Sequence, residues 1–364
     1  MMEMNKKRYQ VDFLPLDKFF FSDENRYRLK SENNGLKLSM DYYQVSRQMP
    51  QQTTMLGVLR YIKLISIGQI PITDKQKAES AIGISSFRYK KEAQDFAAIG
   101  SVSPVGIGFG EETLFPNSFD LDKEGKRRKI LKSTFNYENG SAYILDGYDE
   151  KKGLDHVLIS SSGTIRTYDD VFQASESVGI KKNNRVEGSD DTLYKQTSYT
   201  LNDGYCFRIE VEIDLDSEKK DFIIPMGADG HLFKVIFKEL EENKSLEKVE
   251  NFNYVRLTGD CLINEFDIYK PIFTLTETVV FRHLRSVVKV QNSAYYHSKP
   301  YKNDDSLMPE NQFSRSIKYS LLKRGSVFWF DSHNEAKDFT NLIDQEGNMK
   351  SIGYNHYTTE KVNI

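Results

Sequence analysis

Polar and apolar residues alternate in several short runs along the chain, and these runs end at turn residues. The first run, residues 9–14, stops at Pro15, which lacks the backbone N–H that a strand ladder needs. Because strand side chains point alternately to two faces, such runs predict half-buried strands. The predicted strands are residues 9–14, 205–213, 232–237, 254–258 and 325–330, with residues 225–230 linking the second to the third.

Two other segments repeat apolar residues every three or four positions, which predicts amphipathic helices. In residues 53–65, Thr53 or Thr54 is placed to cap the N-terminus. Arg60 and Lys63 fall outside the apolar stripe of this helix. The stripes consist of Met55, Leu56, Leu59, Ile62 and Ile65 in the first helix, and of Ala336, Phe339, Leu342 and Ile343 in the second, residues 334–343.

The remaining pattern divides the chain into two parts. Residues 238–251 are highly charged and are expected to form a helical connector, which separates residues 1–243 from residues 244–364. Residues 278–290 fit either a strand or a helix. Strands and helices mixed with long antiparallel stretches predict an α+β fold rather than a doubly wound sheet.

Composition limits the classes of protein and partner. The 364 residues are 38% hydrophobic and 12% aromatic, which allows a substantial core. The formal net charge is −3, so any contact with nucleic acid has to come from local basic segments. Cys206 and Cys261 are too few and too far apart for a zinc site or a disulfide framework, which favours a cytoplasmic location. No signal-peptide pattern and no run of about 18 apolar residues occurs, so we expect no membrane partner.

Three local features need an interpretation. The three phenylalanines of residues 19–21 would form a large exposed apolar patch, so we expect them to pack against the domain or a partner. The glycines of residues 101–110 resemble a dinucleotide fingerprint only superficially, because no helix is expected directly after them. Residues 123–132 are the densest basic cluster, but such a run is more often a solvated loop than a binding site.

The sequence offers no residue pattern typical of an enzyme. Cleavage of RNA usually needs a histidine as general acid or base near the 2′-hydroxyl group. The six histidines, His156, His231, His283, His297, His333 and His356, lie in no recognisable catalytic arrangement. The acidic pairs at residues 190–191 and 304–305 have no further metal ligands beside them in the sequence. We therefore expect no catalytic residue, no metal, no cofactor and no small-molecule substrate.

A series of short motifs runs in order along nearly the whole chain. They are Pro15-Leu16-Asp17 with Phe19–Phe21, Gln51–Thr54 followed by Gly57-Val58-Leu59-Arg60, Glu176–Ile180 with Leu193-Tyr194, Met226–Gly230, Gly325–Phe328, and Gly353-Tyr354. In this order the motifs resemble the RAMP superfamily of CRISPR proteins, and specifically the third subunit of the type III-B (Cmr) complex. Three positions depart from that pattern: Val178 replaces a frequent arginine, Asn355 replaces a glycine, and Gly259 replaces a proline.

The resemblance implies two tandem ferredoxin-like, RRM-like domains, with a β-hairpin thumb inserted in the first. It also implies a non-catalytic subunit that contacts the repeat-derived 5′ handle of the guide RNA (crRNA). The implied protein partners are the large polymerase-cyclase subunit and the backbone RAMP subunits. Two alternatives stay open: a RAMP-type endoribonuclease that processes repeat RNA, and the equivalent handle-binding subunit of a type III-A (Csm) complex.

Candidate RNA contacts follow from the chemistry of single-stranded RNA, which proteins bind by stacking bases on aromatic rings and by neutralising phosphates. Residues 179–185 supply three cations and two amides, and Tyr194 on the expected return strand can stack. Glycines allow the protein backbone to approach RNA closely. The full set of candidates is Gln52, Thr53, Thr54, Arg60, Ile180, Lys181, Lys182, Asn183, Asn184, Arg185, Tyr194, Gly227, Gly230, Arg324 and Gly325.

Overall fold

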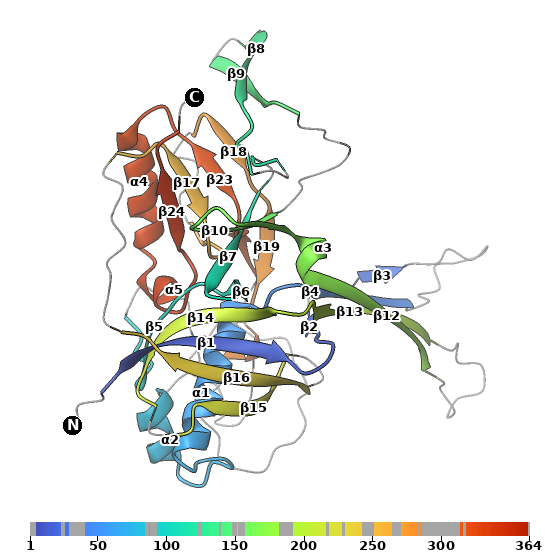
Figure 1. Ribbon diagram of the computed structural model, residues 1–364, viewed down its shortest axis with the longest axis vertical. Coiled ribbons are helices and arrows are strands. Elements are labelled where there is room, and N and C mark those ends of the chain that lie inside the picture. Colours follow the sequence, from blue (N-terminus) through green and yellow to red (C-terminus); the bar gives the residue numbers. More distant parts are fainter. Residues whose placement is uncertain are drawn as a thin grey trace.

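In the computed structural model the regular structure is mainly antiparallel sheet, with few helices (Figure 1). The structure describes residues 5–22, 26–28, 41–83, 87, 93–118, 120–122, 125–137, 140–147, 151, 157–181, 192–215, 218–227, 230–241, 251–263, 271–282, 284–285, 314–315 and 318–362. The mixed α+β class predicted from the sequence is confirmed. Within these residues, no helix is long and apolar enough to cross a membrane.

The largest sheet has nine strands, in the order β11-β10-β7-β6-β14-β1-β16-β15, with β5 also paired to β14. Each neighbouring pair in it is antiparallel. Its strands are β1 (Lys7–Pro15), β5 (Ile99–Val102), β6 (Gly106–Phe109), β7 (Glu112–Asn117), β10 (Val157–Ser160), β11 (Ile165–Thr167), β14 (Tyr205–Ile213), β15 (Asp221–Met226) and β16 (His231–Glu239).

A five-stranded sheet extends away from this body in Figure 1. Its strands are β2 (Phe21–Ser22), β3 (Arg26–Arg28), β4 (Asp41–Arg47), β12 (Phe172–Lys181) and β13 (Thr192–Leu201). The order is β12-β13-β4-β2, with β3 also paired to β4, and β13 runs parallel to β4. We call these five strands the projecting sheet.

A four-stranded sheet, in the order β18-β23-β17-β24, forms the C-terminal part. Its strands are β17 (Tyr254–Leu257), β18 (Phe273–Leu275), β23 (Val327–Trp329) and β24 (Tyr357–Glu360). Three two-stranded ladders pair β8 (Ile130–Tyr137) with β9 (Gly140–Leu145), β19 (Thr278–Phe281) with β22 (Tyr319–Leu322), and β20 (Leu284–Arg285) with β21 (Ser314–Arg315). The helices are α1 (Gln52–Ser66), α2 (Lys75–Ile82), α3 (Tyr168–Val171), α4 (His333–Asp344) and α5 (Gly347–Ser351).

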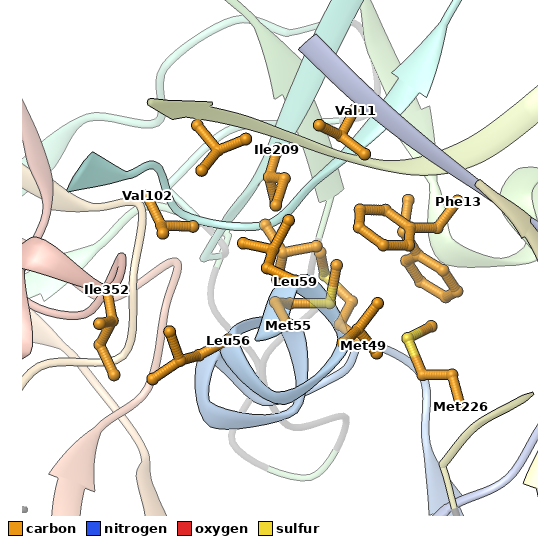
Figure 2. Close-up of a cluster of buried hydrophobic side chains, with 14 of the residues drawn as sticks. Val11, Phe13, Met49, Met55, Leu56, Leu59, Val102, Ile209, Met226 and Ile352 are labelled. Atoms are coloured by element: carbon orange, nitrogen blue, oxygen red, sulfur yellow. The ribbon is translucent and has the colours of Figure 1, made fainter. Parts of the chain in front are cut away.

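Helix α1 packs on two sides. In Figure 2 its Leu59 points toward Val11 and Ile209 of the nine-stranded sheet. Leu56, which precedes Leu59 by three residues, lies beside Ile352, and Ile352 directly follows α5. One hydrophobic cluster therefore joins residues on both sides of the predicted boundary near residue 243, and its C-terminal members are Leu262, Phe281, Leu321, Met349, Ile352 and Tyr354.

Most predicted elements are present. The predicted strand at residues 205–213 coincides with β14, and the helices predicted at 53–65 and 334–343 are α1 and α4. The four apolar residues expected to face inward in α4 are buried, as are all three phenylalanines of residues 19–21. Residues 278–281 form a strand, while most of the predicted connector, residues 242–250, lies outside the described residues. Strand β15 was not predicted. Its last two residues, 225 and 226, lie in the segment that was expected to link two strands directly.

A buried polar cluster fastens Asp120 and Arg127 to the C-terminal sheet. The carboxylate of Asp120 accepts hydrogen bonds from the Tyr254 hydroxyl group at 2.8 Å and from the amide of Asn117. The guanidinium group of Arg127 lies 3.3 Å from Asp120, 2.9 Å from Glu360 and 4.1 Å from the centroid of the Tyr254 ring. The basic cluster predicted as a solvated loop thus contains at least one cation that is used inside the chain.

Replacing Tyr254 by phenylalanine should lower the free energy of unfolding by about 1.5 to 3 kcal/mol, because the buried charged acceptor Asp120 loses a donor. Tyr357→Phe is the matched control, since its hydroxyl group donates to Asp344 at an exposed position. Water can replace that bond, so the control should lose no more than about 0.5 kcal/mol. Urea unfolding of both variants measures the difference, and equal losses would contradict the role of the buried cluster.

Candidate RNA interface

Strands β12 and β13 form a hairpin around the basic segment predicted to bind RNA. Lys181 pairs with Thr192 at the far end of the hairpin, so the two ends of residues 182–191 are held side by side. Ile180, Lys181 and Tyr194 lie in the two strands, which confirms Tyr194 on the return strand. Lys182, Asn183, Asn184 and Arg185 lie outside the described residues.

The start of α1 is used partly inside the chain. Gln51 is the N-cap and makes no side-chain capping bond, so the cap predicted at Thr53 or Thr54 is wrong. The Gln52 side chain is buried and donates to the carbonyl oxygen of Ser103 at 2.9 Å. Its amide occupies the space where a Cβ atom at residue 353 would lie, which explains the glycine there. Thr53 and Thr54 are partly exposed.

Arg60 and Lys63 lie outside the apolar stripe of α1, as predicted, but other elements cover them. The Arg60 guanidinium group stacks 5.5 Å from the centroid of the Phe96 ring. Burial lowers the pKa of Arg60 to about 10, because removal from water disfavours its charged form. Lys63 is buried and donates to the carbonyl oxygen of Asp214 at 2.7 Å. Neither side chain offers a freely exposed cation for a phosphate.

Gly227 and Gly230 flank the turn between β15 and β16, and both are exposed. Their φ angles are +83° and +65°, a backbone region that side chains with a Cβ atom rarely adopt. A Cβ atom at Gly227 would also lie 2.6 Å from the carbonyl oxygen of Phe20. The turn geometry and the contact with Phe20 therefore explain Gly227 independently of RNA.

Arg324 forms a buried ion pair at the junction of the two halves. Its Nε and Nη2 atoms donate to the two carboxylate oxygens of Asp260 at 3.1 and 2.9 Å. Nη2 also lies 3.3 Å from the carbonyl oxygen of Pro50, directly before α1. At the next residue, Gly325, a Cβ atom would lie 3.1 Å from Pro116 of β7. Both residues were candidate RNA contacts, and the structure places both in internal packing.

Arg324→Leu should lower the free energy of unfolding by about 3 to 5 kcal/mol, because the Asp260 carboxylate would stay buried without its cation. Lys323→Leu is the matched control at the neighbouring position. Lys323 pairs with Glu277 at 2.6 Å with both side chains about two-fifths exposed, so its loss should cost about 0 to 1 kcal/mol. Chemical denaturation measures both values, and a small loss at Arg324 would show that the pair does not hold the junction.

A row of residues across the projecting sheet was not predicted from the sequence. Val178, Lys195 and Tyr43 occupy paired positions on β12, β13 and β4, so they share one face, and the backbone of Arg26 on β3 pairs with Tyr43. Val178 is 64% exposed and Tyr43 37% exposed. The Lys195 ammonium group lies 5.7 Å from the centroid of the Tyr43 ring and 2.8 Å from the Glu176 carboxylate. The paired tyrosines of residues 42–43 were the available signal, but their partners on β13, Tyr194 and Lys195, are each 152 residues away in sequence.

The glycines that superficially resemble a dinucleotide fingerprint belong to a hairpin, β6 and β7, with no helix directly after them. A Cβ atom at Gly108 would lie 2.8 Å from the guanidinium carbon of Arg208. That guanidinium group donates to both oxygens of Asp12 and to the backbone carbonyls of Gly110 and Glu112. The glycine spacing thus makes room for an arginine that ties the hairpin to β1.

The described histidines lie in separate elements. His333 faces the backbone of Phe252, with 3.2 Å between Nδ1 and the carbonyl oxygen. The ring nitrogen Nε2 of His356 lies 2.9 Å from the Lys350 carbonyl oxygen, and burial lowers the pKa of His356 below its usual value. His231 begins β16. In the described part of the chain, no group of three or more His, Cys, Asp or Glu side chains could hold a metal ion.

Two solved structures are similar to the chain. Both are chains of the Type III-B Cmr-beta bound to cognate target RNA, determined by cryo-EM, one of them also with AMPPnP in state 1. The complex with cognate target RNA gives a TM-score of 0.50 and 14% identity over 97% of this chain and 99% of the other. The second gives a TM-score of 0.45 and 14% identity over 96% of each chain. No curated protein matches the sequence.

A family model identifies the class of the chain as CRISPR-associated proteins of the Cmr type. The model of one family, described as CRISPR-associated protein (Cas_Cmr3), matches residues 12–257, which is more than half of the chain. The chain belongs to this family.

Proposed function

We propose that this chain is a non-catalytic subunit of a type III-B effector complex and that it binds the 5′ handle of the guide RNA. In this role it bridges the large polymerase-cyclase subunit and the backbone subunits. The observation that carries the proposal is the β12–β13 hairpin in a member of the Cas_Cmr3 family. Its register brings together the two ends of a segment that begins with cations and amides.

The strand order supports the tandem ferredoxin-like arrangement. In the first half, β1, β6, β14 and β16 lie in the sheet order β6-β14-β1-β16. In the second half, β17, β18, β23 and β24 lie in the order β18-β23-β17-β24. Both sheets thus follow the order second, third, first, fourth, with antiparallel neighbours, as in a split βαβ unit. Helix α1 follows the first strand of one half, and α4 precedes the last strand of the other.

Within this proposal, RNA is contacted by residues 180–185, Tyr194, Thr53, Thr54, and the exposed turn that contains Gly227 and Gly230. Gln52, Arg60, Arg324 and Gly325 support these surfaces from inside, through the contacts described above. The thumb of the family corresponds to the β12–β13 hairpin in this proposal.

The triple variant Lys181→Ala/Lys182→Ala/Arg185→Ala should bind the repeat-derived handle RNA roughly 10- to 100-fold more weakly near physiological salt. The slope of log affinity against log salt should become shallower by about two, because three phosphate contacts no longer release counterions. Fluorescence anisotropy with a handle oligonucleotide, measured over a salt series, gives both quantities.

The control for this experiment removes the same charge elsewhere. Lys7, Lys234 and Lys238 are exposed lysines of the nine-stranded sheet, each paired with an acidic residue. Their triple alanine variant should leave handle binding nearly unchanged. If both triple variants lose affinity equally, the binding is a general effect of charge and the hairpin is not the handle site.

Catalysis is a separate arm of the same test. Wild-type chain incubated with repeat RNA should leave it intact, whereas a RAMP-type endoribonuclease would cut it. If cutting occurs and His231→Ala stops it, the non-catalytic role is wrong. Copurification of the tagged chain with its native partners distinguishes type III-B from type III-A subunits.

A further inference from the structure

The face of the projecting sheet that carries Tyr43 has the chemistry of a surface for unpaired bases. An aromatic ring and a cation lie side by side on this face, because Lys195 pairs with Tyr43 on the neighbouring strand and its ammonium group lies 5.7 Å from the ring centroid. The exposed side chain of Val178 extends the row by one strand. Aromatic rings flanked by cations bind single-stranded RNA with little sequence preference, since every base has a face on which to stack.

The local charge of the projecting sheet also suits RNA, although the whole chain has a net charge of −3. Its strands carry five cations, Arg26, Arg28, Arg47, Lys181 and Lys195, and two acids, Asp41 and Glu176. Even without Arg47, which donates to the Val280 carbonyl oxygen, cations outnumber acids by two to one. This excess of cations complements the negative charge of a phosphate backbone.

We propose that the face around Tyr43 and Lys195 is a stacking subsite for an unpaired base of single-stranded RNA. The proposal rests on the proposed function and adds a subsite that lies on the same sheet as the hairpin end at Lys181. One base stacks on the exposed part of the Tyr43 ring, and the neighbouring phosphate takes Lys195 as its counterion.

The Glu176 carboxylate competes with that phosphate for the Lys195 ammonium group. In the free chain the two side chains form an ion pair with both partners about half exposed. Exposed pairs contribute little stability, so a phosphate can take the place of the carboxylate. The same carboxylate repels the phosphate once it is displaced, so its removal should strengthen binding. The subsite therefore predicts effects of opposite sign for two side chains that touch each other.

The experiment measures binding of the full chain to a short oligouridine RNA and to an abasic strand of the same length. Tyr43→Leu should weaken oligouridine binding roughly tenfold and leave the abasic strand unaffected, because only the stacking contact is lost. Tyr43→Phe, which keeps the ring, should bind like the wild type. Lys195→Gln should weaken both ligands, and Glu176→Gln should tighten both.

Lys234→Gln is the matched control for Lys195→Gln. Lys234 is about as exposed as Lys195 and also pairs with an acid on a neighbouring strand, but it lies in the nine-stranded sheet. It should leave both ligands unchanged. Far-UV circular dichroism and melting curves of every variant separate a lost contact from a lost fold. If Tyr43→Leu is destabilised, Tyr43→Phe still tests whether a ring at this position is sufficient for binding.

The possible outcomes separate the subsite from the handle proposal. Wild-type affinity in Tyr43→Leu, or an equal loss on the abasic strand, overturns the subsite, and the handle proposal stands if the hairpin variant still loses handle RNA. A Tyr43→Leu chain that binds RNA normally but fails to assemble with its protein neighbours makes this face a protein interface instead. If the wild type binds no RNA, both proposals fail. If the Tyr43 effect is present but handle RNA binds no better than oligouridine, the subsite stands and handle recognition fails.

Discussion

The double burial of helix α1 is the constraint on which the arrangement of the chain depends. Leu59 and its neighbours bury one side against the nine-stranded sheet, while Leu56 meets Ile352 from the C-terminal half. Burying one large aliphatic side chain contributes about 1.5 to 3 kcal/mol, so a helix covered on two sides joins both halves through a single core. The halves therefore have a fixed relation to each other, and surfaces formed by both keep their geometry.

Two arginines are used in internal contacts that hold this arrangement of the halves. Arg324 pairs with Asp260 at the start of α1, and Arg127 joins Asp120 to the C-terminal sheet. Both guanidinium groups pair with buried carboxylates at the places where segments distant in the sequence meet. These two cations therefore hold distant segments of the chain together and are not exposed binding groups.

The sequence predicted the elements whose pattern is long and regular, such as β14, α1 and α4, because burial of one face imposes a period on the residues. It did not predict β15, a short edge strand that contains a proline, or the row through Tyr43 and Lys195, because register between distant strands leaves no local pattern. Asn355 departs from the family motif in residue type but keeps its backbone geometry. It adopts a φ of +54° where the family motif has glycine, and its buried side chain bonds both backbone groups of Leu262, so the backbone geometry that glycine permits is available to asparagine.

The phenylalanine cluster explains how a sheet that extends away from the body can still present a defined surface. Phe19 exchanges backbone hydrogen bonds with Tyr199 of β13 at 2.7 and 3.1 Å, and its ring packs 5.2 Å from Phe207 of the nine-stranded sheet. The backbone N–H of Phe21 donates to the Ser46 hydroxyl group of β4 at 2.8 Å, inside the same cluster. The root of the projecting sheet is thereby fixed on two of its strands by aromatic packing. Because β13 and β4 stay paired up to Lys195 and Tyr43, these two side chains are positioned by the buried root of the sheet and not by a ligand.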